Sequence, residues 1–458
     1  MNALLVSTYD LGRQPFGLAS PAAWLEREGM TVRCLDLAVE PLDEAAVRAA
    51  DLIAFYLPMH TASRLAGRVI PRVRALNPVA HLCGYGLYAP MNEAWLRGLG
   101  VRSVLGGEFE AGLAALARGL SVVQAGRDLG RLGGTPALVS HARLDFLPPR
   151  RDGLPALERY ARLRIQGEER VVGATEASRG CKHLCRHCPI PPVYGGRFRI
   201  VQREVVLEDI RRQVRAGALH ITFGDPDFFN GVGHALPIVE ALHREHPDLT
   251  YDVTIKIEHL LHHHARLATL RDTGCAFVTS AVESVDDAVL ARLAKGHTRA
   301  DFVAVAGHMR SIGLVLHPTF VAFTPWITLE GYRDLLRTLV ALDLTDHVSP
   351  IQLAIRLLIP RGSLLMELDD VRSLIEPFDA DALVHRWRHP DPRVDALQAV
   401  LERMVAEATG RGESRREIFA RAWAVAGLPA RRVPHERAAA GAAERRPPVP
   451  YLTEPWYC

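Results

Sequence analysis

The sequence predicts an α/β protein made of a doubly wound parallel sheet, an incomplete barrel of βα units and C-terminal helices. Three observations support this prediction. Residues 1–125 alternate short apolar runs with helix-like segments, residues 171–365 repeat that alternation, and three of the seven cysteines fall in one short loop of the second region. Strands that alternate with helices are typical of parallel sheets covered by helices. Clustered cysteines indicate a metal-binding loop.

Composition narrows the class of protein. A chain of 458 residues is long for one domain and predicts two or three. Its 55 basic and 52 acidic residues leave a formal charge of +3, which gives no reason to expect a nucleic-acid partner. No run of about 18 apolar residues and no signal-peptide pattern is found, so we expect no membrane partner and a cytoplasmic protein. Few cysteines fit a reducing compartment.

The first domain is expected at residues 1–125. Five apolar runs are its predicted parallel strands: 3–7, 31–35, 51–56, 80–84 and 103–107. Gly84, Gly86, Gly106 and Gly107 lie at or just after two of these runs, where an open α/β sheet gathers its ligand-binding loops. Cys34 and Cys83 lie within the runs and are interpreted as small buried residues.

The rest of the chain divides into four segments. Residues 126–170 are irregular and basic and are predicted to be a linker. Residues 171–365 should form the barrel, whose active site lies at the carboxyl ends of its strands. Residues 366–430 indicate helices that cover the barrel. Residues 431–458 indicate a flexible tail that ends in Cys458.

The cysteine loop carries the strongest functional signal. Cys181, Cys185 and Cys188 follow CxxxCxxC spacing. Three thiolates from one loop can bind three irons of a [4Fe-4S] cluster and leave the fourth iron open to a small molecule. The alternative is a zinc site with His183 or His187 as fourth ligand. Zinc sites usually come as separated CxxC pairs, so this alternative fits the spacing less well.

The motif E-x-S-R-G at residues 176–180, followed by CxxxCxxC, resembles the signature loop of the radical S-adenosylmethionine (SAM) enzymes. The resemblance implies a partial (βα)6 barrel in which Cys181, Cys185 and Cys188 hold the [4Fe-4S] cluster. It also implies that SAM chelates the open iron and is cleaved to a radical by an electron from a donor such as flavodoxin or ferredoxin. His187 departs from the family, since the residue before the third cysteine is commonly aromatic and packs near adenine.

Two further segments resemble the same branch. Gly224 and Asp225 match, as G-D in place of G-G, the glycine-rich segment that holds the SAM amino group. A turn or a helix cap is the alternative for Asp225 and Asp227. Glu283 and Ser284 match a motif whose residues lie near the SAM ribose. The matching residues 295–298 should begin the next helix, with Thr298 as its N-cap.

Two basic residues lie in predicted barrel strands. Residues 254–259 alternate polar and apolar side chains, as a half-buried strand does, so that Lys256 would meet the SAM carboxylate or ribose. A salt bridge within the barrel is the alternative. Arg356 lies in the apolar strand predicted at 352–358, where a cation needs an anionic partner. We expect it to hold the SAM carboxylate or the substrate, with a structural ion pair as the alternative.

The first domain resembles the Rossmann-type cobalamin-binding domain that precedes the barrel in one large branch of radical SAM enzymes. The loop at residues 106–110 is similar to the loop that ends such a domain. The D-x-H-x-x-G motif that ligates cobalt is missing, because Asp10 is followed by Gly12 and Arg13 with no histidine nearby. Cobalamin is therefore a cofactor that the sequence leaves open.

The tail resembles that of a radical SAM family named for its C-terminal Cys-Cys/Sec-Ala-Glu-Pro ending, with residues 454–458 as the stem. The chain stops at the first cysteine of that motif, which leads to the hypothesis that a selenocysteine codon ended the reading frame. A soft thiolate or selenolate on a tether can bind trivalent arsenic, so Cys458 is a predicted catalytic residue. The resemblance implies transfer of a 3-amino-3-carboxypropyl group from SAM to arsenic.

The sequence therefore predicts a radical SAM enzyme, a transferase, that acts on a small-molecule substrate. Aminocarboxypropyl transfer to trivalent arsenic is the main hypothesis. The alternatives are deoxyadenosyl-radical modification of another metabolite, by methylation or rearrangement, and a non-enzymatic iron–sulfur sensor.

Overall fold

The computed structural model describes residues 1–124, 136–429 and 449–454. Its N-terminal sheet has six parallel strands in the order β2-β1-β3-β4-β5-β6. The strands are β1 (Asn2–Ser7), β2 (Thr31–Asp36), β3 (Leu52–Tyr56), β4 (His81–Tyr85), β5 (Ser103–Gly107) and β6 (Leu138–Ser140). The five predicted strands are confirmed. β6 comes from the predicted linker and extends the sheet.

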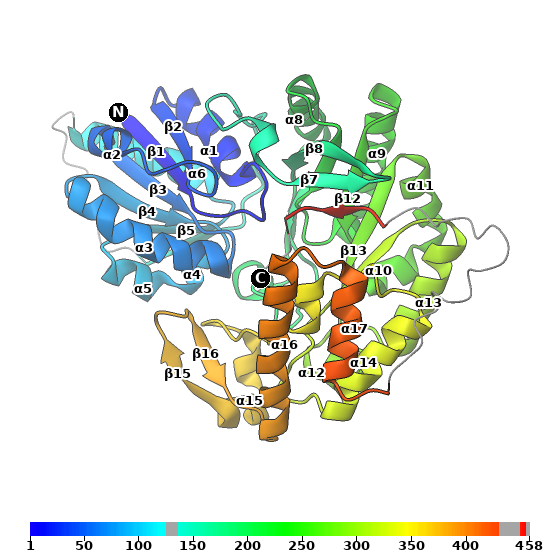
Figure 1. Cartoon of the computed structure of the whole chain (residues 1–458). Helices are drawn as coiled ribbons and strands as arrows, with labels where there is room; N and C mark the ends of the chain where they lie inside the picture. Colours follow the sequence, from blue (N-terminus) through cyan, green and yellow to red (C-terminus); the bar gives the residue numbers. More distant parts are fainter. Residues whose placement is uncertain (125–135, 430–448, 455–458) are drawn as a thin grey trace.

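Helices cover both faces of this sheet (Figure 1). Apolar side chains of α1 (Phe16–Arg27) and α6 (Glu110–Gln124) pack on one face. The other face is covered by α2 (Glu44–Ala49), α3 (His60–Leu76), α4 (Tyr88–Met91) and α5 (Glu93–Gly98). Cys34 and Cys83 are buried in the strands, as predicted. Burial raises the pKa of the Cys34 thiol to about 12, so this thiol is inert.

The second sheet curls into the barrel. Its strands follow the order β14-β13-β12-β11-β8-β7-β17, and the five from β14 to β8 are parallel. They are β7 (Arg162–Ile165), β8 (Glu168–Thr175), β11 (His220–Phe223), β12 (Thr250–Thr254), β13 (Cys275–Glu283), β14 (Leu316–Phe320) and β17 (Tyr451–Leu452). The predicted strand at the start of the barrel and the one before Gly224 are thus confirmed.

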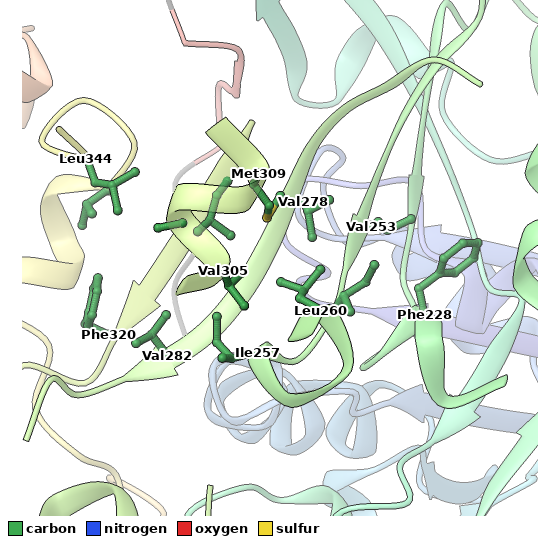
Figure 2. Packing of buried hydrophobic residues seen from close by; sticks show 14 of the residues in the cluster. Phe228, Val253, Ile257, Leu260, Val278, Val282, Val305, Met309, Phe320 and Leu344 are labelled. Atoms are coloured by element: carbon green, nitrogen blue, oxygen red, sulfur yellow. The ribbon is translucent and has the colours of Figure 1, made fainter. Parts of the chain in front are cut away.

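Helices pack on the outside of the barrel sheet. They are α8 (Arg203–Arg215), α9 (Val232–Glu245), α10 (Ile257–His262), α11 (Leu267–Asp272), α13 (Arg299–Ser311) and α14 (Leu329–Ala341). α12 (Asp287–Arg292) packs instead against residues 357–387. Figure 2 shows part of the core between the layers, where Val253 and Val278 of the strands lie near Leu260 and Met309 of the helices. Strand side chains that face the helices are therefore largely apolar, which leaves the opposite face of the sheet for the barrel interior.

Two predicted strands are wrong. The strand expected at 254–259 ends at Thr254, and α10 begins at Ile257, because Ile257 and Leu260 are spaced to bury one helix face. The strand expected at 352–358 is instead a 3-10 helix, Pro350–Leu353, and a single bridge between Arg356 and Phe323. The side chain of Gln352 accepts the hydrogen bond of the Phe320 N–H (2.7 Å), in place of a sixth strand.

The C-terminal region adds helices and an unpredicted hairpin. α15 (Asp369–Leu374) leads into β15 (Ile375–Asp379) and β16 (Val384–Trp387), and α16 (Pro392–Gly410) and α17 (Arg415–Val425) pack on the barrel core. Most of the predicted flexible tail lies outside the described residues, but β17 pairs with β7. Among the helices in the described part of the chain, none is long and apolar enough to span a bilayer.

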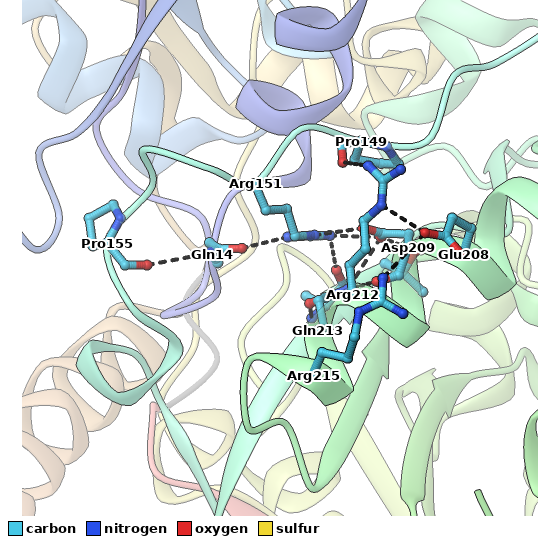
Figure 3. A network of polar contacts seen from close by, with 11 residues as sticks. Gln14, Pro149, Arg151, Pro155, Glu208, Asp209, Arg212, Gln213 and Arg215 are labelled. Carbon is cyan, nitrogen blue, oxygen red and sulfur yellow. Dashed lines mark hydrogen bonds and ion pairs between the residues drawn. The ribbon is translucent and has the colours of Figure 1, made fainter. Parts of the chain in front are cut away.

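The predicted linker is anchored by a buried ion pair (Figure 3). Arg151 donates to both oxygens of Asp209 on α8, at 2.7 and 2.8 Å, and to Ala174 O on β8. Its remaining nitrogen donates to Gln14 of the first domain (2.7 Å). The two side chains are 9% and 0% exposed. One guanidinium thus joins the linker, the barrel and the N-terminal domain.

Replacing Arg151 with alanine should leave the buried Asp209 carboxylate without its cationic partner. We expect the free energy of unfolding to fall by about 3–5 kcal/mol, because a buried charge loses its partner. Urea denaturation followed by circular dichroism measures this loss. The matched control is Arg48→Ala, which breaks the exposed pair with Glu44 and should shift the transition far less. Equal shifts in the two variants would contradict the anchoring role.

Candidate active site

The cysteine loop is shaped by its backbone before any cofactor binds. It follows β8 and passes through β9 (Ser178–Gly180), which pairs with β10 (Phe198–Ile200). Gly180 has a φ of +73°, and a Cβ atom there would lie 2.4 Å from the Arg197 carbonyl oxygen, so only glycine fits. The Cys188 N–H donates to Cys185 O (3.2 Å), which folds the loop back on itself.

The three thiols are close enough to affect one another. Burial raises the pKa of Cys181 to about 11, and the Cys185 thiol adds to the shift. Burial likewise raises the pKa of Cys188 to about 12, with further contributions from Cys185 and Cys181. Cys181 and Cys188 thus resist ionisation, and a strongly cationic centre overcomes this resistance, since metal ligation deprotonates a thiol outright. The donor set therefore fits a [4Fe-4S] cluster held by three cysteines.

The two histidines of the loop lie beside carboxylates. His187 Nε2 lies 3.1 Å from Glu283 Oε1, whereas His183 lies 3.6 Å from Glu258 and 3.8 Å from Asp227. Among the described residues His183 Nε2 has no hydrogen-bond partner, so the cysteine spacing stays the argument against a zinc ion bound by the three thiols.

Asp225 clamps the start of the loop. Its two carboxylate oxygens accept hydrogen bonds from Ala177 N (2.9 Å) and Ser178 Oγ (2.6 Å). Burial raises the pKa of Asp225 to about 7 despite these bonds. Gly224 N donates to Thr175 O at 2.7 Å, so the predicted SAM-binding pair lies directly beside the cysteine loop. Contact with SAM stays a prediction for both residues.

Glu283 connects the other side of the loop to β13. It is buried, its φ is +69°, and it faces Lys295 Nζ (3.4 Å) and His187 Nε2 (3.1 Å). Burial alone would raise the pKa of Glu283, but Lys295 and His187 outweigh that effect and hold it at about 2. A left-handed backbone at a non-glycine residue is strained, and such strain often marks a functional site. The predicted contact of Glu283 with the SAM ribose stays untested.

The predictions for three further residues near the loop have different outcomes. Ser284 Oγ accepts from Asp286 N (3.1 Å), and its predicted place near the ribose is likewise untested. Thr298 is confirmed as the N-cap of α13, in a capping box with Asp301. Asp227 caps the short helix that follows it, since its side chain accepts from Phe229 N.

The two basic candidates are both paired. Lys256 is buried and its Nζ lies 3.0 Å from Glu258 Oε2, so the alternative of a salt bridge within the barrel is present. Arg356 binds Asp395 Oδ1 (2.7 Å) and stacks on the Trp387 ring, 3.5 Å from its centroid. For Arg356 this arrangement supports the structural ion pair over the predicted catalytic role.

Sequence reasoning missed the group that joins the two domains at this site. Arg179 of the cysteine loop binds Glu110 and Glu176, each at 2.6 Å, and lies 3.6 Å from Glu108. Both Glu108 and Glu110 follow β5 and are fully buried. Three rings surround the guanidinium: Phe16, Phe109 and Phe146. The sequence could have indicated this group, because Arg179, Glu108 and Glu110 belong to motifs that stand out in it.

Aromatic rings fill the carboxyl edge of the N-terminal sheet. The rings of Tyr56, Tyr85 and Phe109 lie 5.0–6.0 Å apart. Tyr85 donates to Gly17 O (2.8 Å), and a Cβ atom at Gly17 would lie 2.1 Å from the Tyr56 ring. Tyr85 is fully buried. The space between α1 and the strand ends is therefore occupied by side chains.

Buried polar groups lie at the carboxyl ends of the barrel strands. Several buried polar atoms there have no hydrogen-bond partner among the described residues: Asp227 Oδ2, both ring nitrogens of His297, and Thr324 Oγ1. Burial lowers the pKa of His297 to about 4, with Lys295 contributing, so this ring is neutral. Unpaired buried groups of this kind indicate that the barrel mouth is built to meet polar ligands.

Replacing Asp225 with alanine should loosen the cysteine loop. It removes the acceptor of two buried hydrogen bonds, each worth about 1–3 kcal/mol when a donor is left unpaired. We expect less iron and sulfide per chain after anaerobic reconstitution. Asp43→Ala is the control, because it removes the N-cap of α2 in the N-terminal domain, away from the loop. Wild-type iron content in the Asp225 variant would show that the loop does not depend on it.

The fold and the site agree with comparisons to known proteins. Residues 175–339 match the radical SAM superfamily. The hopanoid C-3 methylase of Methylococcus capsulatus is 26% identical over 341 residues, which make up 70% of this chain and 64% of that relative. The chain thus matches less than two thirds of that relative's length.

Solved structures extend the likeness in fold to most of the chain. The cobalamin-dependent SAM radical enzyme OxsB, with aqua-cobalamin bound, superposes with a TM-score of 0.69 at 14% identity, over 89% of this chain and 67% of OxsB. The radical SAM methyltransferase TsrM from Kitasatospora setae gives 0.66 at 18% identity, over 93% of this chain and 99% of TsrM. At these identities the likeness shows a shared fold. Residues 175–339, which hold the three-cysteine loop at the mouth of the barrel, thus form a domain that matches the radical SAM superfamily.

Proposed function

We propose that this enzyme uses a SAM-derived radical to modify a small polar metabolite at the mouth of its barrel, and that it does so without cobalamin. The observation that carries the proposal is the set of unpaired buried polar groups at the carboxyl ends of the barrel strands. They include His297 and Thr324. At the edge of the N-terminal sheet, tyrosine rings fill the corresponding space.

The chain's own residues would arrange the reactants. Cys181, Cys185 and Cys188 would hold a [4Fe-4S] cluster, which when bound supplies the electron that cleaves a carbon–sulfur bond of SAM. Asp225 keeps the loop in place from one side. Glu283 is anionic at neutral pH, because its pKa is about 2, and can accept hydrogen bonds from a hydroxyl group such as those of a ribose.

Two features support a reaction without cobalamin. Residues 8–14, which follow β1, contain no histidine that could ligate cobalt. The rings of Tyr56, Tyr85 and Phe109 pack against one another at the carboxyl edge of the sheet, where open α/β sheets bind their ligands. OxsB binds cobalamin in a related fold. In this chain the N-terminal domain would serve as a support for the cysteine loop.

We expect cluster-loaded protein mixed with hydroxocobalamin to retain none of it after desalting. Absorbance of the protein fraction measures retention. The matched variant combines Tyr56→Ser with Tyr85→Gly and opens the packed edge, so any gain of binding in it would identify the rings as the obstacle. Stoichiometric cobalamin on the wild-type protein would overturn the proposal of a cobalamin-free reaction.

The nucleoside products of SAM should identify the reaction class. After reduction of the reconstituted enzyme with dithionite in a pool of small metabolites, we expect 5'-deoxyadenosine, measured by mass spectrometry. Methylation, the activity named for the curated relative, would add S-adenosylhomocysteine. A Cys185→Ala variant should give neither. Cluster-loaded protein that yields no SAM-derived nucleoside would contradict an enzymatic role and favour the iron–sulfur sensor.

Aminocarboxypropyl transfer to trivalent arsenic is the second candidate, and the path of the tail favours it. β17 and β8 are both antiparallel to β7, so the tail runs in the direction of β8, toward its carboxyl end. Glu454 Oε1 accepts from Tyr9 O–H (2.8 Å), in the loop whose Arg13 lies beside Gly224. Cys458 lies outside the described residues. The four residues after Glu454 span at most about 14 Å, so the backbone of Cys458 lies within that distance of Glu454.

If this second candidate holds, arsenite should cause the enzyme to release 5'-methylthioadenosine in place of 5'-deoxyadenosine. Cys458→Ser should then lose most of the arsenite-dependent product, because a hydroxyl group is a poor ligand for a soft element. Thr453→Ser is a conservative control in the same tail. Formation of 5'-methylthioadenosine without arsenite, or its persistence in the Cys458 variant, would rule out a role of the thiol. The selenocysteine hypothesis stays a separate prediction.

A further inference from the structure

Three side chains that the radical chemistry does not require meet beside the cysteine loop. His183 comes from the loop itself, Asp227 follows β11, and His259 lies in α10. One ligand atom from each residue lies within 4.8 Å of the other two. His259 Nδ1 is 2.7 Å and His183 Nε2 is 3.8 Å from the same oxygen, Asp227 Oδ2. The two imidazole rings are 4.8 Å apart.

The atoms that face one another have no hydrogen bonds within the described chain. Asp227 Oδ2, His183 Nε2 and His259 Nδ1 are all buried without a correctly oriented donor or acceptor. The Asp227 side chain is only 2% exposed, and its other oxygen accepts from Phe229 N. A buried carboxylate oxygen without a donor is costly. Two imidazole nitrogens directed at that oxygen are therefore better explained by a shared cation than by hydrogen bonding.

We propose that His183, Asp227 and His259 bind one divalent transition-metal ion, in addition to the cluster held by the cysteines. Two imidazoles and one carboxylate form a ligand set typical of Zn²⁺ and of non-haem Fe²⁺. Three protein ligands leave a coordination position open, as in catalytic metal sites. A carboxylate beside one of the ligands also fits a metal site. Glu258 Oε2 lies 3.6 Å from His183 Nδ1, on the side from which carboxylates orient a metal-ligating histidine.

The position of the site suggests a role for its open coordination position. His183 lies two residues from both Cys181 and Cys185 in the same loop, so the ion would lie next to the cluster. An oxygen or nitrogen atom of the substrate would bind the ion and be held close to the place where the radical forms. This role rests on the proposed function, whereas the metal site itself does not.

Metal content tests the site directly. Cluster-loaded protein is treated with EDTA, exchanged into ZnSO₄ and desalted, and its zinc, iron and sulfide are measured together. We expect about one zinc per chain beyond the cluster iron. Asp227→Asn and His259→Gln should lose the zinc and keep the iron and sulfide. The affinity should fall by more than the roughly 10- to 100-fold that changes to outer residues cause. His262→Gln, an exposed histidine of α10, should keep both metals.

Two outcomes would overturn the site. One is wild-type protein that retains no zinc, and the other is zinc in the Asp227 and His259 variants equal to that of the wild type. If a variant also loses its cluster, Co²⁺ titration of the wild-type enzyme decides, because the oxidised cluster is silent in electron paramagnetic resonance. A saturable Co²⁺ signal that Zn²⁺ removes supports the site, and its absence overturns it.

The two proposals can fail separately. Enzyme that cleaves SAM but binds no zinc overturns the metal site alone, and enzyme that binds zinc but cleaves no SAM overturns the proposed function alone.

Discussion

The buried cation of Arg179 is the interaction on which the rest of the structure depends. It extends from the cysteine loop into the edge of the N-terminal sheet and binds Glu110, with Glu108 close by and Glu176 from its own loop. Breaking a buried ion pair leaves an uncompensated charge, so this contact resists separation of the domains. Three phenylalanine rings exclude water from it. The orientation of the loop is thus set by a domain that supplies none of the cysteines.

The same loop is held from two further sides before any cofactor binds. Asp225 accepts two hydrogen bonds at its beginning, and Glu283 binds His187 just before the third cysteine. A site fixed in this way loses little conformational freedom when it takes up its ligands. The strained backbone of Glu283 and the raised pKa of Asp225 are physical consequences of placing these groups in so confined a space.

The carboxyl edges of the two sheets have a similar strand arrangement but carry different side chains. In both, parallel strands present their carboxyl ends to the interface, where α/β proteins usually bind ligands. The rings of Tyr56 and Tyr85 pack at one edge, and unpaired imidazoles and a carboxylate lie at the other. A fold related to that of cobalamin-dependent enzymes therefore does not by itself decide which cofactors this chain uses.

The sequence by itself determined the features that depend on local periodicity and spacing. Five apolar runs gave the N-terminal strands, CxxxCxxC gave the cluster loop, and Thr298 gave a helix cap. The strand predictions at residues 254–259 and 352–358 were wrong. The pattern of the first segment also suits a helix, and in the second a side chain, that of Gln352, takes the hydrogen bond expected of a strand. The tertiary structure alone decided the long-range partners. Arg356 faces Asp395, and Asp227 meets His183 and His259, because packing rather than sequence order places these charges together.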